Sequence, residues 1–436
     1  MFQFFQIMRT GTLFVIAFII TKSNPFTNSA CLKTSEIGVY EQFFLIAGFV
    51  SVFWLTGMLQ SFLSIFNNNN SLTKNEQKSA FFNLLFLFTI FGLFAAIIVY
   101  FCQTPIAYVI EHKHITQIPY LKILLLYIIF SCPANLVEYF YFLKNNPKKI
   151  LIYGIITFLA QLIFVIFPIW FTQDLGYGLY GLVFVNFSRF IWAIILAYKY
   201  SQIKFSREFV KKYLKLSVPL ILGAFISSSA FYINSFMILH KFDLVSFAIF
   251  RYGREFPLIP ILITSYANAI VPSFSNKENF NATLNTLKKD TSRLMNIFFP
   301  ISFIILLLSK FLFPIIFNIN FSESAILFNI YFFMLLGRFI FARSILLGLQ
   351  KTKILFFASI IEVVVNIVLC FILINYLNII GVVIAIVIAS LIEKLFLLLY
   401  LKKTLNIELS NFLNISLYAK YSLILIICFC ISLFFL

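Results

Sequence analysis

The sequence predicts an all-α, polytopic membrane protein, and three observations support this fold class. Of the 436 residues, 62% are hydrophobic and only 11% are charged, whereas a soluble domain carries about 25% charged residues. Many apolar stretches reach roughly 20 residues, the length at which a helix crosses the hydrocarbon core of a bilayer. The stretches are continuous rather than alternating, which favours helices over a β-barrel as the structure that satisfies the backbone in lipid.

Thirteen apolar runs are candidates for spanning helices. They lie near residues 2–20, 38–60, 81–101, 120–142, 149–171, 177–198, 216–239, 245–274, 293–317, 324–348, 353–375, 379–401 and 417–436. The first run has Arg9 as its only charge and no small-residue cleavage motif after it, so we expect a retained helix rather than a signal peptide. The eighth run holds Pro257 and Pro260, and we expect it to be kinked.

The lysines and arginines of the loops predict the orientation. With a cytoplasmic N-terminus, the inside loops hold 19 of the 33 basic residues, and the outside loops and helix starts hold 5. The five outside are Lys22, Lys33, Lys113, Lys122 and Lys241. Because basic residues concentrate in cytoplasmic loops, we expect a multi-pass protein of the bacterial inner membrane with its N-terminus inside. The basic residues of the loops together account for most of the net charge of +18, so the charge does not require a nucleic-acid partner.

An internal repeat is indicated by two similar helical hairpins. Residues 149–199 and 353–402 each open on a lysine, and a glycine follows roughly 30 residues later, Gly181 in the first and Gly381 in the second. We therefore expect two parallel six-helix bundles related by a pseudo-two-fold axis along the membrane normal, with a substrate site between them. The expected segments are a first bundle (1–200), a basic cytoplasmic connector (201–217), a second bundle (218–403) and an additional C-terminal helix (404–436).

Several arginines fall inside the predicted spans, where a charge is expensive unless it faces the bundle interior or water. They are Arg9, Arg189, Arg251, Arg254, Arg338 and Arg343. Arginine stays protonated and binds phosphate or carboxylate through paired hydrogen bonds, so this set predicts a cationic cavity for an anionic cargo.

Acidic residues in the same spans leave a structural interpretation open. Glu255 lies one turn from Arg251, and Glu393 is next to Lys394, so either could form an ion pair that only supports the fold. Glu138 and Glu362 are the candidates for coupling transport to an ion gradient, although each could instead be the partner of an arginine.

Three features resemble a known group of transporters. They are the segment Glu36–Glu41 entering the second run, the stretch from Phe250 through Pro257 to Ala267–Phe274, and the glycine-bearing hairpins. Over roughly residues 1–403 the chain resembles polysaccharide or O-antigen (Wzx-like) flippases of the multidrug/oligosaccharidyl-lipid/polysaccharide exporter superfamily. Such proteins have 12 or 14 helices, so the thirteenth run departs from their pattern.

The resemblance implies a flippase that moves a lipid-linked oligosaccharide on an undecaprenyl-pyrophosphate carrier to the outer leaflet by alternating access. The implied partners are that substrate, membrane lipids and other polysaccharide assembly proteins, as in lipopolysaccharide biosynthesis. No enzymatic activity, cofactor or metal is expected.

Two alternatives remain open. One is an ion-coupled multidrug antiporter of the same superfamily, which usually carries a buried carboxylate in its first half, where the first run has Arg9 instead. The other is a membrane polysaccharide polymerase or ligase, which needs a large outer loop, and all the predicted loops are short.

Overall fold

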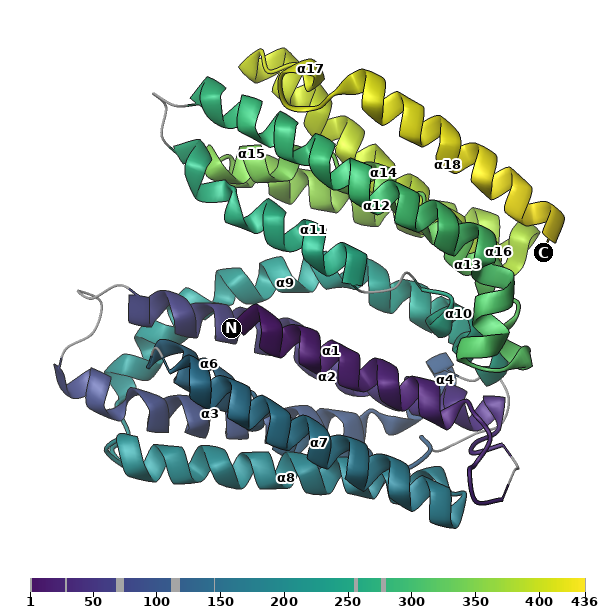
Figure 1. Ribbon diagram of the computed structural model, residues 1–436. Helices are drawn as coiled ribbons and strands as arrows, with labels where there is room; N and C mark the ends of the chain where they lie inside the picture. Colours follow the sequence, from purple (N-terminus) through teal and green to yellow (C-terminus); the bar gives the residue numbers. More distant parts are fainter. Residues whose placement is uncertain are drawn as a thin grey trace. The chain divides into compact units, whose positions relative to one another are not determined.

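The computed structural model describes residues 2–27, 30–67, 74–110, 118–144, 146–254, 258–275 and 280–435. Over these residues the regular structure is helical apart from one isolated bridge between Ser23 and Ala30 (Figure 1). The chain divides into two compact units, Met1–Ala248 and Ile249–Leu436. Three residues named above, Lys113, Glu255 and Pro257, lie outside the described part of the chain.

The helices of the first unit cover the first seven predicted runs and reach into the eighth. They are α1 (Phe2–Ile20), α2 (Thr34–Asn67), α3 (Lys74–Phe101), α4 (Gln103–Ile110), α5 (Leu121–Ala134), α6 (Leu136–Leu143), α7 (Pro147–Thr172), α8 (Leu175–Tyr200), α9 (Arg207–Lys241) and α10 (Leu244–Tyr252), which crosses the boundary between the units. The fourth run is broken into α5 and α6 at Asn135. Pro133, which cannot donate a backbone hydrogen bond, lies two residues before this break.

The second unit contains the remaining helices. They are α11 (Leu258–Ala269), η1 (Val271–Ser275), α12 (Phe280–Ile316), η2 (Ile319–Phe321), α13 (Ser324–Tyr331), α14 (Met334–Arg338), α15 (Ala342–Gly348), α16 (Thr352–Leu405), α17 (Leu409–Phe412) and α18 (Ile415–Phe435). The tenth predicted run is thus three short helices, α13 to α15.

Membrane-spanning length confirms the predicted class. Among the described residues, eight helices are long and apolar enough to cross a bilayer, and ten if each of two bent pairs is one span. The 54 residues of α16 would extend about 80 Å as one straight helix, far beyond a hydrocarbon core of about 30 Å. Asn378 breaks it with a positive φ of 51°, so α16 has two arms, 352–377 and 379–405, which match the eleventh and twelfth runs.

Close backbone approach explains the two glycines of the predicted hairpins. A methyl group on Gly181 of α8 would overlap the carbonyl oxygen of Phe164 in α7, and one on Gly381 would overlap the carbonyl oxygen of Leu373 in the other arm of α16. Both glycines therefore let two antiparallel helices touch at a hairpin. At the first hairpin Asp174 also caps α8, accepting a hydrogen bond of 2.7 Å from the Gly176 amide.

Helix α9 packs within the first compact unit. The division between the two units falls after Ala248, so α9 belongs entirely to the first of them. The reason is the contact between α9 and α2, in which Gly57 of α2 lies against the backbone of Ile221. The buried Tyr213 hydroxyl of α9 also donates to the carbonyl oxygen of Met58. The six-plus-six division stays a prediction about the repeat.

The connector between α8 and α9 is fastened to α3. Asn83 is fully buried, and its side-chain amide donates to the carbonyl oxygen of Lys204 at 3.0 Å. Its side-chain oxygen accepts from the Ser206 amide at 2.9 Å. The amide of Gln202 donates in turn to the carbonyl oxygen of Lys78. This segment is therefore held by specific hydrogen bonds to the first unit.

Candidate functional site

A buried ion pair joins three spanning segments of the first unit. The Arg189 guanidinium of α8 lies 3.4 Å from the Glu138 carboxylate of α6, with side-chain exposures of 11% and 0%. Arg189 Nε donates to the hydroxyl of Tyr153 on α7 at 2.8 Å, and Nη1 donates to Asn186 at 3.3 Å. Arg189 is thus surrounded by acceptors from α6, α7 and its own helix.

Aromatic rings enclose this first cluster. Tyr153 is fully buried, stacks on Phe5 of α1 and meets the Trp192 ring edge-on. The Trp192 indole donates to the Tyr141 hydroxyl at 3.0 Å. The Arg189 guanidinium is mostly buried and donates hydrogen bonds to groups of α6, α7 and α8. We therefore infer that Arg189 stabilises the packing of these three helices. The sequence pointed to Arg189 as a cavity residue and Glu138 as a coupling residue, and the structure brings the two together as one pair.

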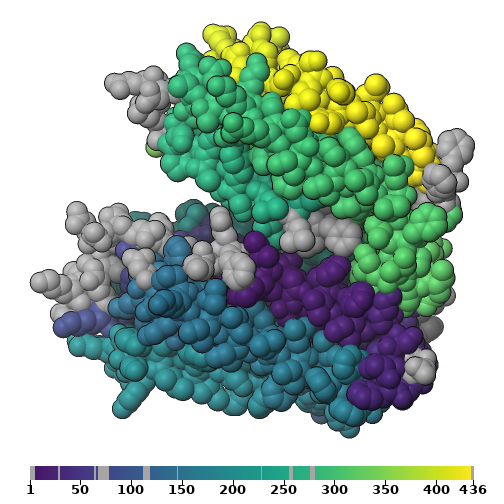
Figure 2. All heavy atoms as spheres, viewed as in Figure 1, coloured from purple at the N-terminus to yellow at the C-terminus, as the bar shows by residue number. Residues whose placement is uncertain are grey.

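Arg9 occupies a different environment in the same unit. It lies on α1, which packs along α7, and its side chain is exposed. Helix α1 is visible on the surface of the first unit (Figure 2). An exposed arginine on an apolar helix needs water or an anion rather than lipid.

A second ionic cluster lies in the second unit. Arg343 of α15 places Nη2 2.7 Å from the hydroxyl of Ser359 and 3.3 Å from the carboxylate of Glu393. The other oxygen of Glu393 is 2.7 Å from Lys394 Nζ. Glu393 is 2% exposed, whereas Arg343 is 43% exposed. Glu362 is half-buried on the first arm of α16, three residues after Ser359.

The two clusters occupy corresponding runs of the predicted repeat. The first joins the fourth, fifth and sixth runs, and the second joins the tenth, eleventh and twelfth. The positions of the two charges are exchanged between the clusters. In the first, the carboxylate is on the fourth run and the arginine on the sixth. In the second, the arginine is on the tenth run and the carboxylate on the twelfth. They also differ in accessibility, since Arg189 is covered and Arg343 is open on one side.

The remaining predicted arginines lie at helix ends of the second unit. Arg251 is half-buried in the last turn of α10, and Arg254 is exposed two residues after that helix. Arg338 is the half-buried last residue of α14. The pairing suggested for Arg251 and Glu255 involves a residue outside the described chain.

Sequence reasoning missed the neutral partners of the charged groups. Tyr153, Asn186 and Ser359 are polar side chains in apolar runs, and that placement is the signal that could have marked them. Hydroxyl and amide groups buried in a bundle normally have hydrogen-bond partners. Asn186 is on the same helix as Arg189, whereas the charged neighbours of Tyr153 and Ser359 come from other helices, so only the fold shows which group these two serve.

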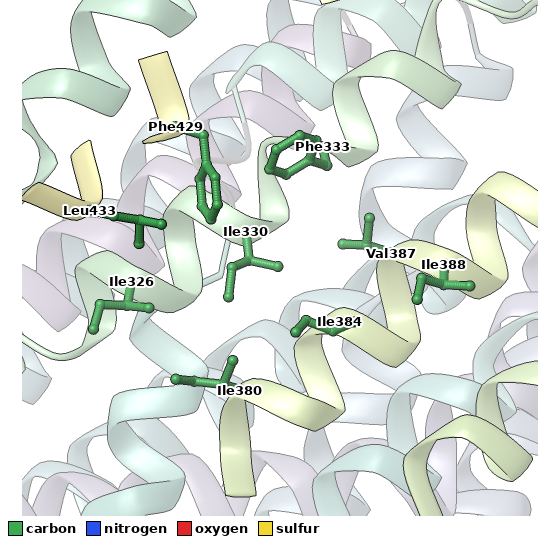
Figure 3. Close-up of a pocket in the computed structure, with 9 residues that line it drawn as sticks. All are labelled: Ile326, Ile330, Phe333, Ile380, Ile384, Val387, Ile388, Phe429 and Leu433. Carbon is green, nitrogen blue, oxygen red and sulfur yellow. The ribbon is translucent and has the colours of Figure 1, made fainter. Parts of the chain in front are cut away.

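An apolar pocket of about 380 Å³ lies apart from these charges in the second unit (Figure 3). Its walls come from α13, the turn between α13 and α14, the second arm of α16 and α18. The lining residues are Ile326, Ile330, Phe333, Ile380, Ile384, Val387, Ile388, Phe429 and Leu433. With no polar lining group, this pocket cannot recognise a charged headgroup.

Comparison with known proteins adds a family and a fold. A family model described as "Lipid II flippase MurJ" matches residues 43–436. A solved structure of the lipid II flippase MurJ in an inward closed conformation is similar with a TM-score of 0.71 and 19% identity, covering 99% of this chain and 92% of that one. No protein with a curated description matches the chain.

Multidrug transporters share the same fold. An inward-facing multidrug resistance MATE family transporter of the MOP superfamily has a TM-score of 0.60 and 15% identity, with 95% of each chain covered. The Vibrio cholerae MATE transporter VcmN has a TM-score of 0.60 and 14% identity, covering 94% of this chain and 98% of that one. The fold is that of MOP superfamily transporters, as the sequence resemblance predicted, whereas the matching family model describes lipid II flippases and not O-antigen translocases.

Proposed function

The chain belongs to the lipid II flippase MurJ family, and from this premise we propose that it moves a lipid-linked precursor across the membrane by alternating access. The cargo is a polyprenyl-pyrophosphate carrying a sugar headgroup. We propose lipid II as its first candidate, because the family is described by that substrate. Transport of this kind requires cavities and moving helices, and we assign no catalytic residue.

Two partly exposed arginines in the apolar bundle carry this proposal. Arg9 is exposed on α1, and Arg343 is 43% exposed at the second cluster. Exposure to hydrocarbon at these positions would be costly, whereas the pyrophosphate of a lipid-linked sugar offers oxygens that a guanidinium binds by paired hydrogen bonds. We propose that these two residues contact the cargo while Arg189 supports the fold.

The other predicted arginines have secondary roles in this proposal. Arg251, Arg254 and Arg338 add positive charge to the second unit and attract the anionic headgroup. The apolar pocket offers no headgroup contact. We also propose that the N-terminus is cytoplasmic, as the loop lysines indicate, and that the protein works in the inner membrane.

The direct test is flipping in reconstituted vesicles. The purified protein is inserted into proteoliposomes that contain a fluorescent lipid II analogue, and arrival of the label in the opposite leaflet is followed by quenching. We expect transport by the wild type and its loss in the double variant Arg9→Gln/Arg343→Gln. The matched control is Arg293→Gln, which removes an arginine of α12 whose side chain is 78% exposed. Equal transport by wild type and double variant would refute the assigned contacts.

A second arm of the experiment identifies the headgroup. Vesicles with a lipid-linked oligosaccharide instead of lipid II test the substrate that the sequence resemblance implied. Transport of lipid II alone supports the peptidoglycan precursor, and transport of the oligosaccharide alone would overturn that choice. Transport of neither substrate would contradict the proposed function.

A further inference from the structure

The connector between α8 and α9 carries a dense group of positive charges that the proposed function does not use. Residues 199–215 hold six basic residues and one acidic residue, Glu208, which gives them a net charge of +5. All six basic residues are exposed, and we call them the connector surface. They are Lys199, Lys204, Arg207, Lys211, Lys212 and Lys215.

The backbone beneath these charges is held in one position. The Ser201 hydroxyl donates to the carbonyl oxygen of Lys78 at 2.9 Å, in addition to the hydrogen bonds that Asn83 makes with the connector. Ser206 caps α9 by accepting a hydrogen bond from the Phe209 amide at 3.3 Å. A segment that is already ordered loses little conformational entropy when a partner binds to it.

Three of the cations form one row along α9. Arg207, Lys211 and Lys215 are spaced by four residues and share an exposed face, whereas Phe209 and Tyr213 are buried on the other face. Like charges at this spacing destabilise a helix. In the described part of the chain no carboxylate lies within 4 Å of these three cations. A negatively charged partner would therefore relieve a repulsion that the folded protein leaves in place.

Exposed apolar side chains lie directly beside the charges. Ile203 and Phe205 are exposed on either side of Lys204, and Tyr198 is exposed next to Lys199. Helix α8 is long and apolar enough to cross a bilayer, so the connector surface begins where a spanning helix ends. Tyrosines are enriched at this level of a membrane protein. A membrane offers both an apolar layer and charged headgroups here, whereas a soluble acidic partner would match only the charges.

We propose that the connector surface binds the headgroups of anionic phospholipids. Arg207, Lys211 and Lys215 contact the phosphates, and Ile203 and Phe205 enter the apolar layer beside them. A guanidinium binds phosphate oxygens by paired hydrogen bonds, and an ammonium group attracts them as a point charge. The interaction uses none of the residues assigned to the cargo, so it goes beyond the proposed function.

A second basic turn of the first unit provides a matched comparison. Lys144, Lys148 and Lys149 are exposed at the turn between α6 and α7, which lies at the same end of this unit as the connector (Figure 1). Residues 145–147 between them are Asn, Asn and Pro, so no large apolar side chain accompanies these lysines in the turn. They also form no row at four-residue spacing, and we do not assign them to the site.

The test compares two phospholipids that carry a dansyl group on the acyl chain, phosphatidylglycerol and zwitterionic phosphatidylcholine. Each is titrated into the purified full chain in neutral detergent, and energy transfer from tryptophan measures binding. Trp192 lies on α8 seven residues before Lys199. At low salt we expect phosphatidylglycerol to bind roughly tenfold or more tightly than phosphatidylcholine, because each cation near an anionic headgroup contributes about fivefold. The preference should shrink at about 0.5 M salt, which screens exposed charges.

Two triple variants separate the connector surface from net charge. Arg207→Gln/Lys211→Gln/Lys215→Gln should bring the two lipids within about twofold of each other, because the attraction to the headgroup is removed. Lys144→Gln/Lys148→Gln/Lys149→Gln removes the same charge from the same unit and should keep the preference of the wild type. All six substituted residues are exposed, and an unchanged melting temperature shows that each variant is folded.

A further double variant tests the apolar part of the surface. Ile203→Ser/Phe205→Ser leaves every charge in place, so both lipids should bind several-fold more weakly with the same ratio between them. Equal binding of the two lipids by the wild type would reject an anionic phospholipid as the partner and leave a soluble acidic one. An equal loss of preference in the two triple variants would reject the connector as the site. Unchanged binding of both lipids by the double variant would reject the contact with the apolar layer.

Discussion

Replacing Glu138 with glutamine tests whether the first cluster holds the first unit together. The substitution keeps the shape of the side chain and removes its charge, so Arg189 loses its only carboxylate within 4 Å among the described residues. Glu138 is fully buried and Arg189 is 11% exposed, so solvent cannot replace the missing partner. We expect the variant to be less stable than the wild type.

The magnitude follows from the burial of the pair. Removing one partner of a buried ion pair costs about 3–5 kcal/mol. Arg189 keeps its hydrogen bonds to Tyr153 and Asn186, so we expect a loss of about 3 kcal/mol. For a unit of this size each kcal/mol lowers the unfolding temperature by about 2–4 °C, so Tm should fall by roughly 6–12 °C.

The assay is thermal unfolding in detergent followed by tryptophan fluorescence. The three tryptophans of the chain, Trp54, Trp170 and Trp192, all lie in the first unit, and Trp192 contacts Tyr153 in the cluster itself. The control is Glu408→Gln, which breaks a pair with Lys402 at 4.0 Å whose members are 67% and 61% exposed. Such a pair contributes about 0–1 kcal/mol, so its Tm should hardly change.

A double variant decides whether the loss comes from an uncompensated charge. Glu138→Gln/Arg189→Met removes both charges and should recover most of the stability lost in the single variant. If Glu138→Gln unfolds at the wild-type temperature, or if the double variant is no more stable than the single one, the role given to this pair is wrong.

Three other predictions concern packing, the connector and the orientation. Gly181→Ala should greatly reduce the amount of folded protein, because the added methyl group overlaps the Phe164 carbonyl oxygen. The control Gly223→Ala should be neutral, because nothing lies within 4 Å of the added carbon. The amount of monodisperse protein on size-exclusion chromatography measures both effects. Asn83→Ala should speed amide hydrogen exchange at Ser206 at least tenfold, because that amide loses its acceptor, and unchanged exchange would contradict the fastened connector. A cysteine in place of exposed Lys204 should be blocked only by a membrane-permeant thiol reagent if the N-terminus is cytoplasmic, and blocking by an impermeant reagent in intact cells would reverse the orientation.

The spanning helices could be predicted from sequence because hydrophobic length is a local property. The runs at 149–171 and 177–198 correspond to α7 and α8 within a few residues, and Gly181 marked the hairpin between them. Breaks inside a span were harder to predict. The division of the tenth run into three helices and the positive φ of Asn378 depend on packing that no single window of residues reveals.

The charged residues of the two clusters could be identified from the sequence, but the ion pairs that they form could not. Arg189 and Glu138 are 51 positions apart in the chain, and Arg343 and Glu393 lie on different helices. A charge in an apolar run signals a special position, but which arginine is covered and which is open depends on neighbours from other helices. The structure therefore separates Arg189 from Arg343, two residues that look equivalent in the sequence.

The central claim is that this chain flips a lipid-linked pyrophosphate through contacts with Arg9 and Arg343, and transport in proteoliposomes tests it most directly. The predicted result is lipid II translocation by the wild type and by Arg293→Gln, with none above protein-free vesicles for Arg9→Gln/Arg343→Gln. If all three proteins are folded and the double variant translocates lipid II at the wild-type rate, the contacts assigned to Arg9 and Arg343 are wrong. If the wild type does not translocate lipid II, the proposed function itself is wrong.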